Sequence, residues 1–242
     1  MRRLIDKTNA DIACEWDKAA KYRLEQITSG KDRTYNEFLI PLFLNEVEQK
    51  KFNFVLDIGC SVGVLTKKIS SLVNHVDAID ISDVSINLAI ENNYASNVNF
   101  VTHDAASYIS SVKYDLIIAN MFLMDCLYLD EIVENMQKLC VVGGEVLITI
   151  ANPLVWPEYW GYRNAKWFNY NEELIIESDF RVTGIKESGF ITTHIHRPLS
   201  RYIDELVKNR FYITYFGELT GYIPSKERIK IPRYLFIKCT RH

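Results

Sequence analysis

Residues 53–150 alternate short apolar runs with stretches that carry apolar residues at helical spacing. Such alternation is typical of βαβ units, which form a parallel sheet with right-handed crossovers. No other feature of the chain restricts the fold as strongly. We expect strands over 54–58, 76–79, 98–101, 114–119 and 145–150, with helices over 64–73, 85–92, 105–110 and 130–140. Gly143-Gly144 is the expected turn before the last of these strands.

The segments before and after this region have other patterns. Residues 1–48 predict two helices, and Pro41 lies early in the second one. Residues 152–197 contain three of the four tryptophans and predict an antiparallel pair of strands. The expected helices are 11–26, about 35–50 and 198–209, and the expected strands are 180–185, 190–195, 211–216 and 234–239. We therefore predict a doubly wound α/β fold: a seven-stranded Rossmann-like sheet with its last hairpin inserted antiparallel, and a helical and aromatic cap.

Charge and cysteine content argue against several classes of protein. The chain has 28 Lys and Arg against 31 Asp and Glu, a formal charge of -3, so no nucleic-acid partner is expected. Its five cysteines are scattered and form no C-x-x-C pair. This argues against a metal site or a disulfide framework and predicts a reducing, cytoplasmic location. We see no signal-peptide core and no apolar run near the roughly 20 residues that span a bilayer, so no membrane association is expected.

The most informative motif is residues 55–63, Val-Leu-Asp-Ile-Gly-Cys-Ser-Val-Gly. It reads as an apolar strand that contains an acid, then a tight glycine loop, then the start of a helix. Glycines let backbone amides approach a ligand because no Cβ intervenes. In an open α/β sheet, ligands bind beyond the carboxyl ends of the strands. A plain strand-to-helix turn without a ligand is the simplest alternative.

Two other chemical interpretations of this loop fit less well. A dinucleotide site needs G-x-G-x-x-G, whose glycines admit a pyrophosphate, and the spacing here is G-x-S-x-G. That spacing matches a hydrolase nucleophile elbow literally. The elbow normally follows several earlier strands, whereas only helices are expected before Gly59. We therefore interpret Ser61 as a loop residue rather than a nucleophile.

Acids at three successive strand ends favour an adenosyl-sulfonium ligand. Asp80 lies about 20 residues after Gly59, where a carboxylate can accept both ribose hydroxyls. Asp104 follows the third expected strand, where a carboxylate can accept an adenine amino group. One such acid is more often a helix cap, but Asp57, Asp80 and Asp104 together indicate a ligand site.

These motifs resemble those of class I S-adenosylmethionine-dependent methyltransferases, of the type 11/12 small-molecule branch. Residues 55–66 resemble the family's first motif with Ser61 at its middle glycine, Asp80-Ile81-Ser82 its ribose motif, and His103-Asp104-Ala105 its adenine motif. Residues 114–125 resemble its fourth motif, in the form with Met-Asp in place of a His pair. The resemblance implies S-adenosylmethionine as cofactor and S-adenosylhomocysteine as product. It assigns the cofactor site to Asp57, Gly59, Cys60, Ser61, Gly63, Asp80, Ile81, Asp104, Ala105, Asn120 and Met121.

Residues 196–202 resemble a His-Arg-x-Leu-Ser-x-Tyr segment of the same branch. This implies that His196 faces the substrate, and His194 would share its face of a strand. Either histidine is a candidate catalytic base, which a hydroxyl acceptor requires because its proton must leave. A lone histidine is more often structural. The candidate acceptor residues are Trp16, Tyr22, Asp125, Trp160, Tyr170 and Arg197.

The predicted function is methyl transfer from S-adenosylmethionine to a small molecule, by O- or N-methylation, through in-line displacement. The alternatives are a nucleic-acid or protein methyltransferase, or an inactive methyltransferase-like binding subunit. We expect one domain, 1–242, acting as a monomer or homodimer. Within it we assign residues 1–48 to an N-terminal helical cap, 49–151 to a cofactor-binding core, 152–197 to a substrate lid and 198–242 to a return to the core. The sequence does not identify the acceptor.

Overall fold

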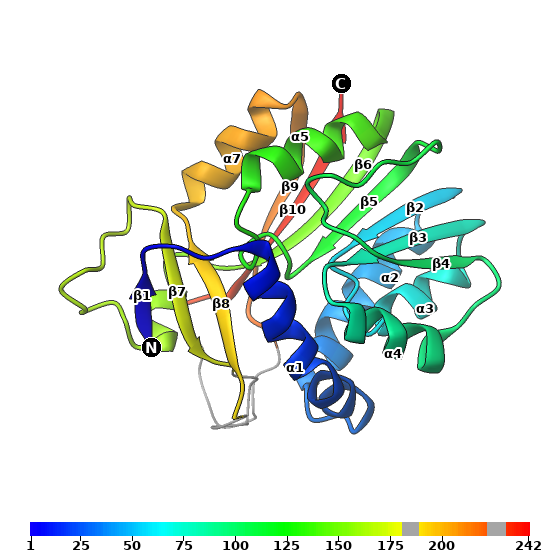
Figure 1. The fold of residues 1–242 in the computed structure, drawn as a ribbon. Coiled ribbons are helices and arrows are strands. Elements are labelled where there is room, and N and C mark those ends of the chain that lie inside the picture. Colours follow the sequence, from blue (N-terminus) through cyan, green and yellow to red (C-terminus); the bar gives the residue numbers. More distant parts are fainter. Residues whose placement is uncertain (181–188, 222–230) are drawn as a thin grey trace.

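The computed structural model describes residues 1–180, 189–221 and 231–242 (Figure 1). Within these residues, seven strands form one sheet in the order β4-β3-β2-β5-β6-β10-β9. Strand β10 lies between β6 and β9 and is antiparallel to both, which confirms the predicted doubly wound sheet. The strands are β2 (Phe54–Ile58), β3 (His75–Asp80), β4 (Val98–Thr102), β5 (Tyr114–Asn120), β6 (Cys140–Ala151), β9 (Phe211–Leu219) and β10 (Tyr234–Arg241).

Helices cover both faces of this sheet (Figure 1). One face carries α2 (Ile40–Glu48), α3 (Val64–Ser70) and α4 (Asp83–Asn93), and the other carries α5 (Leu129–Leu139) and α7 (Leu199–Lys208). Successive side chains of a strand point to opposite faces. In β2, Val55 therefore packs into one hydrophobic cluster and Leu56 into the other. Burial on both faces explains why the strands are apolar throughout.

A second, three-stranded antiparallel sheet lies beside the first. It contains β1 (Arg2–Leu4), β7 (Leu174–Asp179) and β8 (Ile191–His196). Helix α1 (Asn9–Thr28), which a Thr8–Asp11 capping box begins, lies between the two sheets in Figure 1 and contacts both α4 and β8. The short helix α6 (Trp156–Trp160) belongs to the same region. Segments far apart in the sequence thus form one layer over the main sheet.

The expected helix over 105–110 is wrong, because these residues form a turn. The carboxylate of Asp104 accepts a hydrogen bond from the amide of Ala106. The side chain of Asn135 donates to the carbonyls of Ala105 and Tyr108. These partners satisfy backbone groups that a helix would have paired internally.

Three smaller expectations also need correction. Gly143-Gly144 is not a turn between elements, because both residues lie inside β6 at an irregularity in its pairing with β5. The segment expected as a second helix begins with a π-helix, η1 (Tyr35–Leu39), which runs directly into α2. The antiparallel pair is present, but its first strand is β7. Residues 181–185 of the expected strand, and Glu187-Ser188 of its turn, lie outside the described residues.

Candidate active site

The loop after β2 bends sharply at the carboxyl end of the strand. Gly59, Ser61 and Gly63 all adopt positive φ, at 71°, 51° and 75°. The amides of Gly59 and Cys60 both donate to the carbonyl of Ile79, at 2.8 and 3.1 Å, which joins the loop to β3. A Cβ at position 59 would lie 2.5 Å from the ring of Phe122. Glycine is therefore required there by both the backbone conformation and the close contact.

Asp80 ends β3 beside this loop, and its carboxylate is held by backbone amides. One oxygen accepts from the amide of Ser61 and the other from the amide of Ser82, both at 2.9 Å. Burial raises the pKa of Asp80, and these two hydrogen bonds oppose the rise. The side chain is thus fixed in orientation at the point where the strands end.

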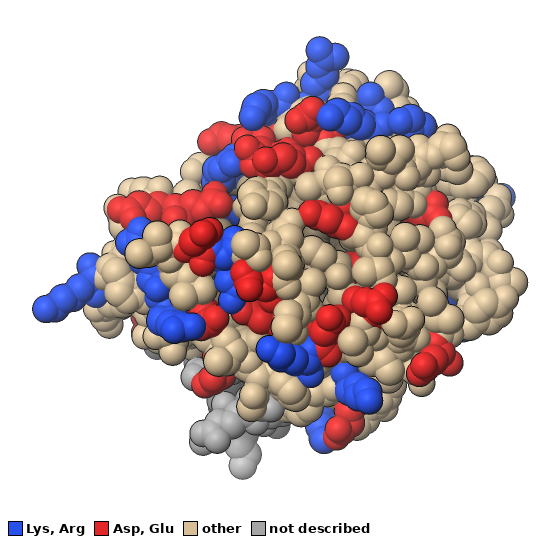
Figure 2. All heavy atoms as spheres, in the orientation of Figure 1, with Lys and Arg blue, Asp and Glu red and all other residues tan. Residues whose placement is uncertain are grey.

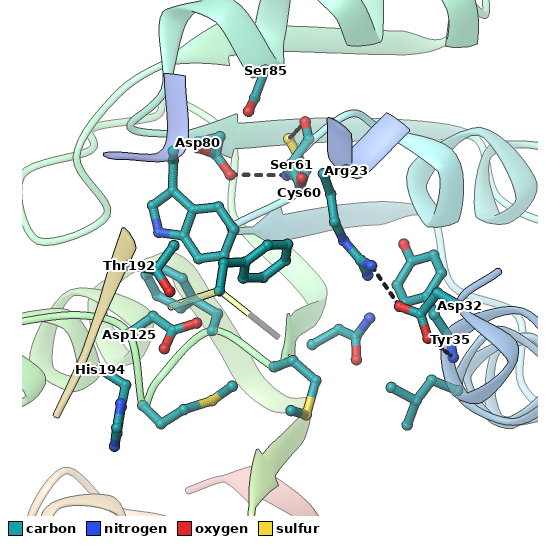
Figure 3. Close-up of a pocket in the computed structure, with 18 of the residues that line it drawn as sticks. Arg23, Asp32, Tyr35, Cys60, Ser61, Asp80, Ser85, Asp125, Thr192 and His194 are labelled. Atoms are coloured by element: carbon teal, nitrogen blue, oxygen red, sulfur yellow. Dashed lines mark hydrogen bonds and ion pairs between the residues drawn. The ribbon is translucent and has the colours of Figure 1, made fainter. Parts of the chain in front are cut away.

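A cavity of about 220 Å³ lies over the carboxyl ends of β2, β3 and β5, enclosed by residues of α1, α6 and β8. We call it the main cavity. Its labelled polar side chains form three groups in Figure 3: Ser61 with Asp80, Arg23 with Asp32, and Asp125 with Thr192 and His194. A smaller cavity of about 40 Å³ contains Asp104 and shares wall residues with the main cavity. The shared residues are Ile12, Gly59, Asp80, Ile81, Phe122 and Asp125.

The second of these groups, Arg23 with Asp32, joins α1 to the segment that follows it. Arg23 forms an ion pair with Asp32, and its guanidinium lies 4.9 Å from the centre of the Tyr35 ring. The other carboxylate oxygen of Asp32 accepts from the amide of Tyr35 at 3.0 Å. This corner therefore offers a fixed guanidinium, with Arg23 and Asp32 both lining the main cavity.

The third group, which we call the Asp125 corner, consists of Asp125, Thr192 and His194. Among the described residues, no group donates a hydrogen bond to the Asp125 carboxylate. Burial and then the nearby charge of Glu15 raise its pKa well above the ordinary value, while Arg197 acts in the opposite direction. His194 is 3% exposed. Its Nε2 lies 3.3 Å from the hydroxyl of Tyr162, and its Nδ1 has no partner among the described residues.

Burial, and secondarily the proximity of His196, lowers the pKa of His194 to about 3. The imidazole is therefore neutral at physiological pH. A neutral ring carries one proton on its two nitrogens. When Nε2 donates to Tyr162, Nδ1 keeps a free lone pair. The Asp125 corner thus combines an unpaired carboxylate with a neutral imidazole.

A family model described as a methyltransferase domain matches residues 50–187, more than half of the chain. The chain belongs to the methyltransferase domain family. This membership confirms the class of enzyme that the glycine loop and the strand-end acids indicate. No curated protein matches the sequence of this chain.

Several solved structures share the fold. The N-methyltransferase NodS from Bradyrhizobium japonicum WM9, in complex with S-adenosyl-L-homocysteine, is 14% identical with a TM-score of 0.64, covering 98% of this chain and 99% of its own. A DhpI–SAH complex is 14% identical with a TM-score of 0.65 and covers 96% of both chains. An S-adenosylmethionine-dependent methyltransferase from Clostridium acetobutylicum ATCC 824 is 13% identical with a TM-score of 0.63, covering 91% of this chain and 97% of its own. At these identities the likeness shows a common fold.

Most of the predicted cofactor residues surround the two cavities of the methyltransferase. Asp57 and Gly63 line neither cavity. Asp57 lies behind the loop, where it accepts from the hydroxyl of Thr66 at 2.6 Å and burial raises its pKa to about 6. A Cβ on Gly63 would lie 2.8 Å from the ring of Phe100, so this glycine permits close packing. The main cavity is lined by Gly59, Cys60, Ser61, Asp80, Ile81, Asn120 and Met121, and the smaller one by Asp104 and Ala105.

The predicted acceptor residues fall into two sets. Trp16, Asp125, Trp160 and His194 line the main cavity. His196, Tyr22, Tyr170 and Arg197 line neither cavity. The Nε2 of His196 lies 3.0 Å from the carbonyl of Tyr170 and donates to it, and its ring packs edge-on against Phe168 and Tyr170. Tyr22 packs against Phe190, and the hydroxyl of Tyr170 accepts from the amide of Leu199.

Arg197 has a structural role in the methyltransferase. Its side chain is 1% exposed and donates to the carbonyls of Leu123, Cys126 and Leu127 at 2.8–3.0 Å. It also forms an ion pair with Glu173. The guanidinium therefore holds the loop that carries Asp125, rather than facing the cavity.

The sequence interpretation missed Arg23, Asp32, Phe122 and Thr192. One signal for Arg23 was available, because it follows Trp16 by seven residues and so shares that residue's face of α1. A charged residue on the inward face of a helix is a candidate ligand group. The position of Phe122 against Gly59 depends on a contact between two separate loops, which local patterns do not report.

The surface of the methyltransferase carries mixed charge. On the face shown in Figure 2, Lys and Arg side chains are interspersed with Asp and Glu and form no continuous basic stripe. In residues 1–180, 189–221 and 231–242, no group of three His, Cys, Asp or Glu side chains is placed to hold a metal ion. None of the described helices is both long and apolar enough to span a bilayer.

Proposed function

We propose that this methyltransferase transfers a methyl group from S-adenosylmethionine to a small-molecule acceptor, at oxygen or nitrogen. One observation carries the proposal: the main cavity joins the glycine loop and Asp80 at one corner to the Asp125 corner at another. A donor and an acceptor would therefore meet in one partly enclosed space. Its walls from α1, α6 and β8 favour a small acceptor over a folded macromolecule, and the mixed surface charge disfavours nucleic acid.

The polar groups around the two cavities fit this cofactor. Asp80 keeps lone pairs for the ribose hydroxyls beside the two amides it already binds. Asp104 lines the smaller cavity, and we propose that its carboxylate accepts the adenine amino group. Arg23 supplies a guanidinium for the methionine carboxylate. When bound, the cofactor supplies a methyl group made electrophilic by its positive sulfur.

The chain then aligns the acceptor, excludes water and receives a proton. Aromatic residues of α1 and α6, including Trp16, Trp156 and Trp160, line the cavity wall and would keep water from the reacting atoms. We infer that His194, rather than His196, is the group at the acceptor, because only His194 lines the cavity. With a pKa of about 3, this imidazole is too weak a base to take the acceptor's proton at neutral pH, so its proposed role is to orient the acceptor. The five free cysteines support a cytoplasmic location, and we propose a monomer or homodimer.

Cofactor binding tests the first part of this proposal. Asp80→Ala is expected to weaken S-adenosylhomocysteine binding by about 1–3 kcal/mol, the scale of hydrogen bonds to a charged group. Isothermal titration calorimetry measures the effect, with a melting curve to confirm folding. Asp83→Ala, on the exposed start of α4, is the matched control and should leave affinity unchanged. Equal affinity in folded Asp80→Ala protein would remove Asp80 from the cofactor site.

Enzyme kinetics separate the two histidines. His194→Asn is expected to lower kcat/KM by about tenfold, the scale of one lost orienting hydrogen bond, with near-normal cofactor affinity. His196→Asn should instead lower the melting temperature, because it removes a buried hydrogen bond to Tyr170. Steady-state kinetics with an acceptor found by screening provides the comparison. A loss of kcat/KM in His196→Asn alone would reverse the assignment.

A further inference from the structure

The Asp125 carboxylate lacks the partners that other acids in this region have. Asp80 binds two amides, and Asp32 binds Arg23 and an amide. Glu15, which lies near Asp125, accepts from Lys7 and from both the amide and the hydroxyl of Thr193. Among the described residues, nothing donates to Asp125. The side chain is half-buried, and a carboxylate partly withdrawn from water without donors is costly, so a ligand that supplies donors and positive charge would stabilise it.

The Nδ1 of His194 is a second unsatisfied atom on the same wall. His194 is only 3% exposed, and it lines the main cavity. Buried polar atoms normally have partners. Both the Asp125 carboxylate and this nitrogen are acceptors when His194 donates through Nε2 to Tyr162. The Nδ1 atom has almost no accessible surface, so the carboxylate is the acceptor that a ligand in the cavity can reach.

The surroundings also favour a cation over a neutral group. The walls of the main cavity include Asp32, Asp80 and Asp125, whereas Arg23 is the only Lys or Arg among its described residues and is already paired with Asp32. The ring of Trp160 lies 4.5 Å from that of His194, centre to centre. Further aromatic rings line the same cavity, and aromatic faces attract cations. The rings that line it are Trp16, Tyr35, Phe122, Trp156, Tyr159, Trp160, Phe180 and Tyr234.

The backbone around this corner is held in place. Arg197 binds the carbonyls on both sides of Asp125, at Leu123, Cys126 and Leu127. The amide of Ile195 donates to the carbonyl of Met124 at 2.7 Å, which joins β8 to the same loop. A mobile loop could turn the Asp125 carboxylate toward water, but this loop is held by Arg197 and by β8. The unpaired carboxylate is therefore a fixed feature of the fold.

We propose that the acceptor is a small amine, bound as its ammonium ion by the Asp125 carboxylate. The inference rests on the proposed methyl transfer and narrows its acceptor from oxygen or nitrogen to nitrogen. A primary ammonium group offers three donors and a positive charge on one atom, which supplies what the Asp125 carboxylate lacks.

The proton balance of the reaction fits this arrangement. An ammonium nitrogen has no lone pair, so one proton must leave before the nitrogen attacks. Asp125 accepts that proton, and burial, which favours its neutral form, assists the transfer. The nitrogen lone pair then forms the bond to the methyl carbon as the carbon–sulfur bond breaks, and that bond's electron pair stays on sulfur. The products are a methylated ammonium ion and the neutral thioether.

Matched pairs of amines and alcohols provide the test. S-adenosylhomocysteine binding is measured first by calorimetry, which examines the proposed function separately. The loaded protein is then titrated at pH 7 with phenethylamine against 2-phenylethanol, tryptamine against tryptophol, and butylamine against butanol. We expect amines to bind at least about tenfold more tightly than their alcohols, the scale of one charge-assisted hydrogen bond. Asp125→Asn should abolish this preference and leave S-adenosylhomocysteine affinity unchanged.

Asp130→Asn is the control, because Asp130 is exposed and five residues away on α5; it should keep the preference. A protein that binds S-adenosylhomocysteine but prefers no amine over its alcohol would overturn the amine assignment alone. Loss of S-adenosylhomocysteine affinity in Asp125→Asn would also overturn it, because Asp125 would then serve the cofactor. Absent S-adenosylhomocysteine binding in the unmodified protein would reject the proposed function itself.

Discussion

At the scale of single residues, the candidate site depends on titratable groups whose pKa values are shifted by burial. Burial raises the pKa values of Asp57, Asp80 and Asp125 and lowers that of His194. Among the described residues, Asp125 has no donor to its carboxylate, and His194 keeps one ring nitrogen, Nδ1, without a partner. Perturbed titratable groups in a cavity are more often functional than structural. The identity of their ligand follows from the remaining unsatisfied atoms.

His194 makes stability depend on pH in a defined direction. Its pKa is about 3 in the folded chain and about 6.5 when unfolded, so unfolding takes up a proton between these values. Stability is therefore fully present above about pH 6.5 and falls as the pH drops toward 3, by up to about 1.4 kcal/mol per pH unit. Urea unfolding of the unmodified protein and His194→Gln at pH 4.5–7 measures the difference in slope. His242→Gln, at an exposed terminal position, should keep the original slope, and identical slopes in all three proteins would contradict the prediction.

At the scale of elements, the loop between β5 and α5 is shaped by a residue more than seventy positions away. Arg197, immediately after β8, donates to three of its carbonyls. This loop carries Phe122 and Asp125, both of which line the main cavity. The second sheet thus determines the form of a loop that belongs to the first sheet.

Removing this guanidinium should loosen the loop. Arg197→Met is expected to destabilise the protein by about 1–3 kcal/mol, because buried carbonyl acceptors lose their donor, and to speed hydrogen exchange over residues 123–127. Arg163→Met, whose ion-pair partner Glu158 is exposed, should change stability by less than about 1 kcal/mol. Denaturant unfolding with hydrogen-exchange mass spectrometry measures both effects. Unchanged exchange in the loop of Arg197→Met would exclude the clamp.

The elements differ in how far the sequence predicts them. The βαβ region is predictable because both faces of its strands are buried, which leaves clear apolar runs such as β2 and β5. The turn at 105–110 was mistaken for a helix because its pattern is short and its backbone groups are satisfied by Asn135, thirty residues away. Asp80 and Asp104 follow from strand ends alone. The turning of His196 away from the cavity depends on how β8 packs against residues 168–170, which strand periodicity does not report.

At the scale of the whole molecule, two layers meet at the site. The seven-stranded sheet contributes the glycine loop and Asp80, while α1, α6 and β8 contribute most of the opposite wall. Contacts such as Thr193 to Glu15 hold β8 against α1. We propose that residues 1–48, 152–180 and 189–197 form a lid over the core, and that ligand specificity lies in this lid.

A lid of this kind should respond to ligand. S-adenosylhomocysteine is expected to slow hydrogen exchange in α1, α6 and β8, because segments that open for ligands are less stable than the core. Peptides from β9, at the far edge of the main sheet, serve as the internal reference and should not change. Hydrogen-exchange mass spectrometry with and without ligand gives the comparison. Equal exchange in both states would exclude a ligand-responsive lid.

The carboxylate of the smaller cavity already has a partner from α1. The side-chain amide of Asn9, at the start of that helix, donates to the Asp104 carboxylate at 2.6 Å, where the proposed adenine amino group would donate. A carboxylate has about four acceptor sites, so the adenine either shares Asp104 with Asn9 or displaces it. With displacement, the observed dissociation constant is the intrinsic one divided by the fraction of molecules with Asp104 free, and we propose that the first turn of α1 is then an intramolecular competitor of the cofactor.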